Sequence, residues 1–395
     1  MTYMTEERLL EIVESCSTPF YLFDGETLRR RVEYLRTSLP PSVSLCYAVK
    51  ANPFLAGELA GLVDRLEICS PGELRICQRL ELPREKFVVS GVYKEPDLMA
   101  RLIAQQEPPC LYTVESFNQL ALLHQGAVAA KKQISLLLRL TSGNQFGMTA
   151  EEIETILERY SHDPFVEVRG IQYFSGTQKT SLKRLKRELD RLDALFQDWE
   201  KRLGFLPGEL ELGPGLPVAY FPEDDFDEPA FLEEVSSLLE HMAYHGPKIL
   251  ELGRSIAASC GTYVTRVVDV KSNATGNYAI LDGGIHHLVY YGQSMGMRRP
   301  PLELLGPRDS DQVQLWNLCG SLCTIHDLLA KQVPLPSLKP GDLLAFHNAG
   351  AYSMTEGISL FLSRDLPQVA LLDAQGQLHT LRRPLEIDLL NSPCY

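Results

Sequence analysis

Short apolar runs alternate with segments of helical spacing through the first two-thirds of the chain. Eight of these runs are predicted to be strands. They are Ser44–Val49, Leu66–Ser70, Lys86–Ser90, Cys110–Val114, Ile134–Leu140, Val166–Phe174, Glu209–Leu212 and Lys248–Leu252. Segments between them, such as Glu151–Tyr160 and Leu182–Leu203, have the spacing of helices. Repeated strand–helix alternation predicts a parallel (β/α)8 TIM barrel.

The pattern changes after about residue 258. Thr262–Val270 and Tyr278–Leu281 alternate like strands, and segments punctuated by Gly and Pro follow, such as Leu338–Asp342. Short strands at close spacing predict a β-domain. We therefore expect an N-terminal segment over residues 1–22 that packs on the β-domain, a barrel over residues 23–258, and a C-terminal β-sandwich or β-barrel over residues 259–395.

Composition narrows the class of protein. The chain has 395 residues, 45% of them hydrophobic and 23% charged, which is the balance of an ordinary globular protein. Its formal net charge of −13 argues against nucleic acid or an anionic membrane as the main partner. No apolar run is long enough to span a bilayer, and the acidic, amphipathic N-terminus is unlike a signal peptide.

The nine cysteines are odd in number and irregularly spaced. Without an export signal, this usage predicts reduced thiols in a cytoplasmic protein. Cys319, Cys323 and His326 have the residue types of a metal site. No second ligand pair completes four coordination positions, so we expect no metal.

The stretch "LCYAVKANP" (Leu45–Pro53) places Lys50 directly after a predicted strand. Burying an ammonium group is costly unless it is paired or neutral. In (β/α)8 barrels the active site lies at the carboxyl ends of the strands. Lys50 follows the first strand, Phe174–Thr177 the sixth, Gly213–Gly215 the seventh and Glu251–Arg254 the eighth.

The last two of these loops fall where such barrels commonly bind phosphate. Glycine backbone can approach a phosphate closely and Arg254 can bind it with a planar fork. Glycines that only make tight turns are the alternative. A lysine and a phosphate site at one barrel mouth suggest pyridoxal 5'-phosphate, with Glu251 at the ring nitrogen. Two alternatives stay open: Glu251 pairs only with Arg254, or Lys50 binds a phosphate-bearing substrate without any cofactor.

Nine motifs in order resemble the fold-type III pyridoxal-phosphate decarboxylases, the group of ornithine, diaminopimelate and arginine decarboxylases. They are "YAVKAN" (Tyr47–Asn52), "EICSPGEL" (Glu67–Leu74), "QFGM" (Gln145–Met148), "ELGPGLP" (Glu211–Pro217), "ELGR" (Glu251–Arg254), "LDGG" (Leu281–Gly284), "CGSLCTIHD" (Cys319–Asp327), "GDLLAF" (Gly341–Phe346) and "AGAYSM" (Ala349–Met354). The resemblance covers nearly the full chain.

The resemblance implies a role for each matching residue. Lys50 would bind the cofactor covalently, Glu251 would pair with the pyridine nitrogen, and Arg139 would lie near the cofactor. The phosphate would be held by Thr177, Gly213, Gly215, Gly253, Arg254 and Tyr352. Cys323 would return a proton after carbon dioxide leaves, in the site of a partner subunit, so a head-to-tail homodimer with shared sites is implied. An ordinary buried thiol is the alternative for Cys323.

Departures from the family pattern concern the substrate. Phe174 replaces a histidine that stacks on the cofactor; the ring can still stack but cannot transfer a proton. Thr324 replaces the acidic residue that binds the distal cation of dibasic substrates, which makes such substrates less favoured. The segment after "LDGG" lacks the arginine that grips a distal carboxylate, and Gln145 replaces a lysine. His287 and His286 either line the substrate entrance or pack within the domain.

These departures resemble an antibiotic-biosynthesis branch that decarboxylates a glutamyl group carried as a thioester on an acyl carrier protein, as in the butirosin pathway. Carrier proteins are acidic, so this acidic chain would need a basic patch, around Lys183–Arg191 or Arg298–Arg299. We therefore expect a pyridoxal-phosphate α-decarboxylase acting on an amino acid or aminoacyl carrier. The alternatives are a diaminopimelate-, ornithine- or lysine-type decarboxylase of a free amino acid, an amino-acid racemase, and a non-enzymatic cofactor-binding homologue.

Overall fold

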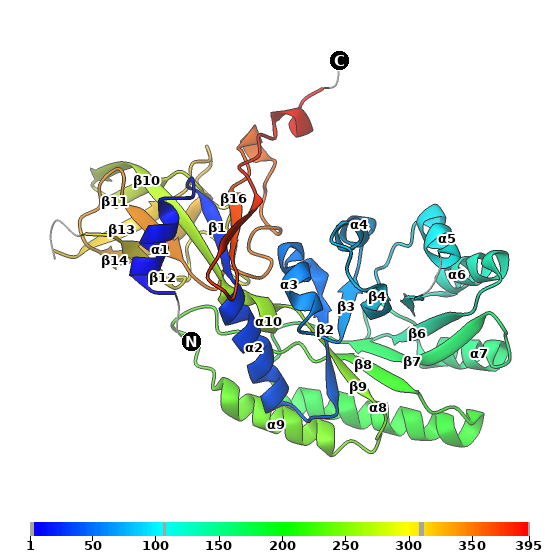
Figure 1. The fold of residues 1–395 in the computed structure, drawn as a ribbon. Coiled ribbons are helices and arrows are strands. Elements are labelled where there is room, and N and C mark those ends of the chain that lie inside the picture. Colours follow the sequence, from blue (N-terminus) through cyan, green and yellow to red (C-terminus); the bar gives the residue numbers. More distant parts are fainter. Residues whose placement is uncertain (1–3, 106–107, 308–311, 394–395) are drawn as a thin grey trace. The chain divides into compact units, whose positions relative to one another are not determined.

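The computed structural model describes residues 4–105, 108–307 and 312–393. The chain forms two compact units (Figure 1). The barrel unit comprises residues 32–217 and 227–253, and the sheet unit comprises the described parts of residues 1–31, 218–226 and 254–395. The sequence-based domain boundaries, after residues 22 and 258, stay predictions.

The barrel unit contains a closed barrel of eight parallel strands that neighbour one another in chain order (Figure 1). The strands are β2 (Val43–Ala48), β3 (Arg65–Ile68), β4 (Phe87–Val89), β5 (Leu111–Val114), β6 (Ile134–Leu140), β7 (Val166–Phe174), β8 (Glu209–Gly213) and β9 (Lys248–Leu252). The predicted (β/α)8 barrel is confirmed. The bounds of β6, β7 and β9 coincide with those predicted.

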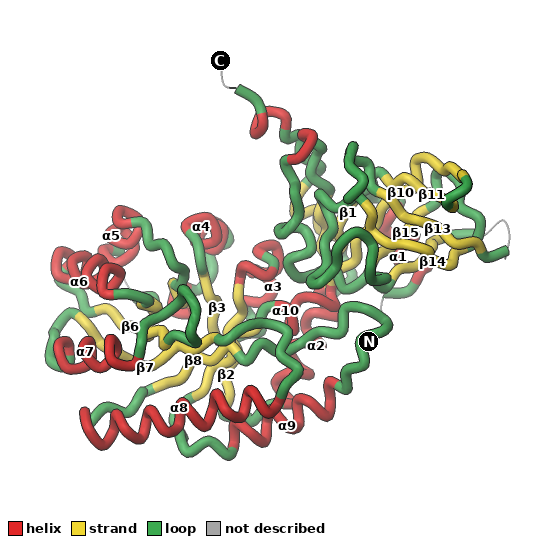
Figure 2. Tube along the Cα trace, turned by 180° about the vertical axis from the view of Figure 1, so that it is seen from behind, coloured by secondary structure: helices red, strands yellow, loops and turns green. Residues whose placement is uncertain are grey.

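Helices follow most of these strands. They are α3 (Ala56–Ala60), α4 (Pro71–Arg79), α5 (Pro96–Ala104), α6 (Phe117–Ala130), α7 (Ala150–Tyr160), α8 (Leu182–Leu203) and α9 (Glu228–Glu240), and α2 (Gly25–Ser38) crosses the boundary between the units. Capping fixes their starts: Ser70, Ser116, Thr149 and Ser181 each accept a hydrogen bond from a first-turn N–H. Helices α8 and α9 lie side by side (Figure 2). Among the described helices, none is both long and apolar enough to cross a membrane.

One layer of the barrel core is made by Cys46, Val88, Leu111, Leu137 and Ile249, all buried and packed together. Because side chains alternate along a strand, residues two positions further on point into the barrel as well, nearer its carboxyl end. The core layer therefore predicts which side chains face the barrel mouth.

The sheet unit contains a nine-stranded mixed sheet with the order β14-β13-β11-β10-β1-β16-β17, in which β15 pairs with β10 and β12. Its strands are β1 (Phe20–Asp24), β10 (Gly261–Asn273), β11 (Gly276–Leu281), β12 (Leu302–Leu305), β13 (Gln314–Cys319), β14 (Leu328–Leu335), β15 (Leu343–Phe346), β16 (Gln368–Leu372) and β17 (Leu378–Arg382). Helix α1 (Glu6–Val13) packs Leu9 and Ile12 against Phe20 and Val264 of this sheet. The unit also contains the short helix α10 (Arg254–Ala257). A separate β-domain is thus confirmed.

Candidate active site

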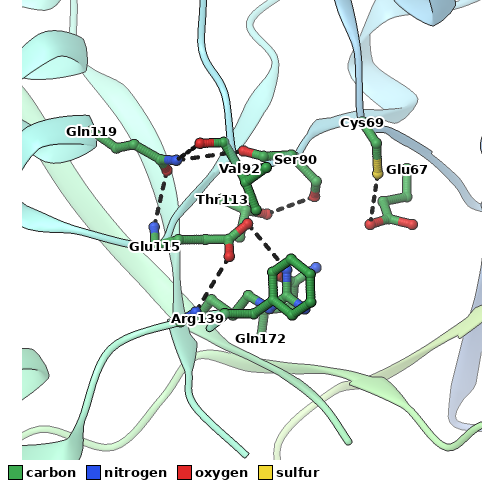
Figure 3. Close-up of polar contacts among 12 residues, drawn as sticks. Glu67, Cys69, Ser90, Val92, Thr113, Glu115, Gln119, Arg139 and Gln172 are labelled. Carbon is green, nitrogen blue, oxygen red and sulfur yellow. Dashed lines mark hydrogen bonds and ion pairs between the residues drawn. The ribbon is translucent and has the colours of Figure 1, made fainter. Parts of the chain in front are cut away.

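Polar side chains occupy the inward positions just above the apolar core layer of the barrel. They come from seven strands or the residues directly after them, and are Glu67, Ser90, Thr113, Arg139, Gln172, Glu211 and Glu251. Figure 3 shows part of this layer, with Ser90 and Thr113 joined by a hydrogen bond of 2.9 Å between their hydroxyl groups. A polar layer inside an otherwise apolar barrel is costly to build, so it indicates a functional site at the strands' carboxyl ends.

Lys50 lies in a single turn of 3-10 helix, Val49–Ala51, that follows β2. Its ammonium group pairs with the carboxylate of Glu67, and its Nζ lies 3.5 Å from Sγ of Cys69. The Lys50 side chain is 41% exposed, whereas that of Glu67 is 5% exposed. The sequence predicts a buried ammonium group at Lys50. Instead, Lys50 lies past the end of β2 at the open mouth, and the buried charge of this pair is the carboxylate of Glu67.

Arg139, at an inward position of β6, forms an ion pair of 3.0 Å with Oε1 of Glu115 (Figure 3). The other carboxylate oxygen of Glu115 accepts a bond of 3.3 Å from the backbone N–H of Gly147. The Arg139 guanidinium also lies 4.9 Å from the ring centre of Phe146. The "QFGM" segment is therefore fixed against the barrel mouth by Arg139 and Glu115.

Glu251, at the end of β9, is buried and accepts a hydrogen bond from Nε2 of Gln172. Burial raises the pKa of the Glu251 carboxyl well above its usual value, and the negative charges of Glu67 and Glu211 add to this. Burial also raises the pKa of Glu211, although Arg65 bonds to that carboxylate at 3.1 Å. One Oε of Glu211 and the Oε1 of Gln172 are buried without a hydrogen-bond partner among the described residues. The end of β9 thus holds a proton-binding carboxyl and unsatisfied acceptors.

The loops after β7 and β8 approach each other at backbone distance. A Cβ added to Gly213 would lie 2.2 Å from the Phe174 ring, and one added to Gly215 would lie 2.2 Å from the carbonyl oxygen of Gly176. Gly215 also has φ = 66°, which favours glycine. Thr177 is exposed on the first of these loops, and its role stays a prediction.

Arg254, which directly follows Gly253, is enclosed by aromatic rings of the sheet unit. Its guanidinium lies 4.2 Å from the ring centre of Tyr352 and 4.7 Å from that of Tyr291. It also approaches the hydroxyl of Tyr220 at 3.3 Å and the carboxylate of Glu356 at 3.6 Å, and its side chain is 8% exposed. Tyr352 has φ = 62°, a strained value for tyrosine. Backbone strain at a residue predicted from the motif alone points to a functional role.

Cys323 and Thr324 lie in the loop between β13 and β14 of the sheet unit. Cys323 is exposed, unlike most of the described cysteines. Buried Asp327 fixes the loop, because its carboxylate accepts from the N–H groups of Leu322 at 2.7 Å and Ile285 at 2.8 Å. The two residues are therefore presented by a tightly hydrogen-bonded turn.

His287 is buried inside the sheet unit. Its Nδ1 lies 3.2 Å from the Tyr263 hydroxyl and its Nε2 lies 2.7 Å from the carbonyl oxygen of Asp365. Burial lowers the pKa of His287 to about 4 and that of the neighbouring His286 to about 3. This environment favours packing, the alternative to a place at the substrate entrance, and substrate contact by His287 stays a prediction.

Several polar residues of the barrel interior and mouth were not singled out from the sequence. They are Arg65, Glu67, Cys69, Lys94, Glu115, Gln172 and Glu211. The sequence contains a pattern that points to them, because each strand residue among them alternates with apolar residues that face outward from the barrel. Without the strand register, however, an inward polar residue cannot be distinguished from a solvent-facing one.

The barrel fold and a lysine at its mouth define a class of cofactor-dependent barrel enzymes, and comparison with known proteins identifies the family. A family model described as pyridoxal-dependent decarboxylase, C-terminal sheet domain, matches residues 20–350. The chain therefore belongs to the pyridoxal-dependent decarboxylases. It is an enzyme of the carboxy-lyase class and its cofactor is pyridoxal 5'-phosphate, as the motifs predicted.

Individual relatives span nearly the whole chain. The L-glutamyl-[BtrI acyl-carrier protein] decarboxylase of Niallia circulans is 26% identical, covering 96% of this chain and 94% of that protein. The diaminopimelate decarboxylase of Vibrio cholerae serotype O1 is 32% identical, covering 88% of this chain and 86% of that protein. The crystal structure of AQ1208 from Aquifex aeolicus has a TM-score of 0.83 at 25% identity, and the match covers 97% of this chain and 93% of that chain.

The residues of the barrel mouth suit this cofactor. Lys50 offers a primary amine at the open end, and the buried Glu251 has an unsatisfied polar neighbourhood in which a ring nitrogen would find a partner. Gly213 and Gly215 leave no room for a side chain, so the backbone of this loop is what would face a phosphate at the end of β8. The roles of these residues toward the cofactor are proposals.

Proposed function

We propose that this enzyme removes the α-carboxylate of a glutamyl group whose side-chain carboxyl is held as a thioester on an acyl carrier protein. The reaction would take place in the cytoplasm, as part of an antibiotic-type biosynthesis. The main observation in support of this proposal is that the Cys323–Thr324 loop offers no carboxylate to the distal ammonium group of a dibasic substrate.

Thr324 occupies the position after Cys323 where enzymes for dibasic substrates have an acid. Its hydroxyl accepts a bond of 3.3 Å from the N–H of His326. The nearest carboxylate in the loop, Asp327, is buried and bonded to two backbone N–H groups. A substrate ammonium placed here would lack a compensating charge, whereas a neutral thioester would not need one.

Pyridoxal phosphate, when bound, supplies an electron sink for the electron pair left behind by departing carbon dioxide. In the proposed site the amine of Lys50 would hold the cofactor, and Glu251 would pair with its ring nitrogen. The backbone at Gly213 and Gly215 would bind the phosphate, and the motif match assigns Arg254 and Tyr352 to the phosphate as well. Phe174 would stack on the ring, and Arg139 would stabilise the adjoining loop.

We further propose that Cys323 supplies the proton that replaces the lost carboxylate, acting in the site of a partner subunit. The exposure of Cys323 in the single chain supports this role, because the thiol is available to a neighbouring molecule. A head-to-tail homodimer would then contain two shared sites.

Decarboxylation of free diaminopimelate is the second candidate, favoured by the 32% identity to the Vibrio cholerae enzyme. The carrier-protein relative supports the first candidate at 26% identity over a larger share of the chain. Residues that contact the distal end of the substrate separate the two better than overall identity does, and here that residue is Thr324.

A carbon dioxide release panel tests the proposal. It compares glutamyl-loaded BtrI acyl-carrier protein and the glutamyl thioester of N-acetylcysteamine with free glutamate, ornithine, lysine and diaminopimelate. We expect release from the thioesters and little from the free amino acids. Thr324→Asp should shift preference towards ornithine and lysine, while the matched control His326→Asp should not. Efficient release from diaminopimelate and none from either thioester would establish the second candidate instead.

A further inference from the structure

The first half of helix α8 carries an outward stripe of basic side chains on a chain whose formal net charge is −13. The stripe consists of Lys183, Arg187 and Arg191, which are exposed and follow one another at intervals of four residues. Residues 183–191 contain five basic and two acidic side chains, a net formal charge of +3. The helix buries the opposite side through residues that include Leu185 and Leu189.

This arrangement is unfavourable for the helix itself. Basic residues at a helix N-terminus oppose the helix dipole, and like charges four residues apart repel each other. Most other barrel helices have an acid in their first turn, such as Glu73 in α4, Asp97 in α5, Glu151 in α7 and Glu228 in α9, and the first turn of α6 is uncharged. Helix α8 has none. A local electrostatic cost that the neighbouring helices avoid points to a role in binding.

The acids of this segment already have partners. Glu188 bonds to Lys179 at 2.7 Å and to Arg184 at 3.0 Å, and Asp190 pairs with Lys186. Within the described part of the chain, no hydrogen bond or ion pair involves the side chains of the stripe. Its three positive charges are therefore available to another molecule.

The stripe is connected to the rim of the candidate active site. Helix α8 follows the loop that begins at the end of β7, so its first turns lie at the same end of the barrel as Lys50. Arg184 donates from Nη2 to the carbonyl oxygen of Ser175 at 3.1 Å, and the Ser175 hydroxyl donates to Glu188 at 2.7 Å. The helix that carries the stripe and the loop at the mouth thus form one hydrogen-bonded piece.

Of the second basic pair expected from the sequence, Arg299 is a single exposed charge that donates to the carbonyl oxygen of Gln332 at 3.0 Å, and Arg298 is paired. Arg298 forms ion pairs with Glu223, at 3.2 Å, and with Asp224, and it lies 3.9 Å from the ring centre of Phe221. Its charge is compensated within the sheet unit. Of the two basic segments, the stripe on α8 is therefore the better candidate for binding an acidic partner.

We propose that Lys183, Arg187 and Arg191 dock an acidic carrier protein that delivers the aminoacyl group to the barrel mouth. The inference rests on the proposed function and names the surface that the carrier uses. From Lys183 to Arg191 the stripe is about 12 Å long, the length of two turns of an acidic partner helix. Nucleic acid is not favoured, because it needs an extended basic surface and this chain is acidic elsewhere.

The test compares two triple variants of the full-length holoenzyme. K183Q/R187Q/R191Q removes the stripe. R79Q/R101Q/K201Q is the matched control, because it removes one lysine and two arginines that are exposed near the ends of α4, α5 and α8. The substrates are glutamyl-loaded BtrI acyl-carrier protein and the glutamyl thioester of N-acetylcysteamine, which has the same reacting group without a protein surface.

We expect the stripe variant to lose roughly tenfold in kcat/KM for the loaded carrier, with kcat/KM for the small thioester unchanged and the thermal stability equal or slightly higher. The control should keep both activities. Equal use of the carrier by wild type and stripe variant, or use of the small thioester without use of the carrier, would overturn the docking surface while leaving the chemistry intact. Failure of wild type with both thioesters would instead overturn the proposed function and this inference with it.

Discussion

The ammonium group of Lys50 pairs with the buried carboxylate of Glu67, which comes from the neighbouring strand of the barrel. Cys69 adjoins both groups and lies 3.2 Å from Oε1 of Glu67. Burial acts to raise the pKa of Glu67, but the charge of Lys50 and the hydrogen bonds from Lys50 and Cys69 outweigh it and lower the pKa. Glu67 is therefore ionised at neutral pH and favours the protonated form of the amine.

Glu67→Gln should make Lys50 more reactive in the cofactor-free protein. Without the carboxylate, the protonated amine loses its ion pair with Glu67, so its neutral, nucleophilic form becomes less costly to reach. We expect modification of Lys50 by trinitrobenzenesulfonate to be about three- to tenfold faster, measured by mass spectrometry of the Lys50 peptide. Glu58→Gln, an exposed change on α3, is the control. An unchanged rate would show that the ion pair has no influence on the amine.

Glu251→Gln should stabilise the cofactor-free protein, and more so at high pH. Burial and the charges of Glu67 and Glu211 raise the pKa of Glu251 well above its ordinary 4.5. This carboxyl therefore binds a proton more strongly in the folded protein than in the unfolded protein. Its contribution to stability is therefore favourable at acid pH and is lost as the pH rises above 4.5 towards the folded value.

Thermal unfolding at pH 5 and pH 8 provides the measurement for Glu251→Gln. The rise in Tm relative to wild type should be a few degrees at pH 8 and smaller at pH 5. Glu240→Gln, an exposed change at the end of α9, should have little effect at either pH. A variant less stable than wild type at pH 8 would contradict the assignment of Glu251 as a destabilising buried acid.

Arg65→Met should strongly destabilise the barrel. Arg65 pairs with Glu209 at 2.6 Å and with Glu211 at 3.1 Å, and both carboxylates are buried. Removing the guanidinium leaves the buried Glu211 carboxylate without its cation and leaves Glu209 with only Arg169, at 3.7 Å, a loss of about 3–5 kcal/mol in the free energy of unfolding. Urea unfolding measures the loss. The triple variant R65M/E209Q/E211Q should recover most of it, and a single variant as stable as wild type would refute the interpretation.

The fold was largely predictable because each barrel strand is a short apolar run between turn residues. The bounds of Ile134–Leu140 and Val166–Phe174 were correct at both ends. The loops at the strand ends were also predictable, since chain order alone puts Lys50, Gly213 and Glu251 at one end of a parallel barrel.

Side-chain partners were not predictable in the same way. Arg139 and Glu115 are 24 residues apart in sequence, and Gln172 and Glu251 are 79 apart. Each pair depends on how strands are aligned around the closed barrel, which the apolar pattern does not specify. The exposure of Lys50 likewise depends on a 3-10 turn that carries the residue past the strand end.

A mixture of Lys50→Ala and Cys323→Ala homodimers should recover activity if the sites are shared between subunits. Each variant alone should lose at least about a hundredfold in decarboxylation, because one lacks the cofactor amine and the other the proton donor. Exchange of subunits would produce one intact site in half of the dimers, so about a quarter of wild-type activity should return. Carbon dioxide release after mixing is the measurement, and no recovery despite proven subunit exchange would place both residues in a single-chain site or remove Cys323 from the reaction.

The central claim is that the barrel mouth at Lys50 is the cofactor site, and borohydride reduction of the holoenzyme followed by peptide mapping tests it most directly. Lys94 is the competing amine, since burial lowers its pKa to about 8 and its Nζ contacts the carbonyl oxygen of Gly91 at 3.1 Å. We predict a phosphopyridoxyl group on the Lys50 peptide that is absent from Lys50→Ala and retained in Lys94→Arg. A label on Lys94, persisting in Lys50→Ala, would contradict the account.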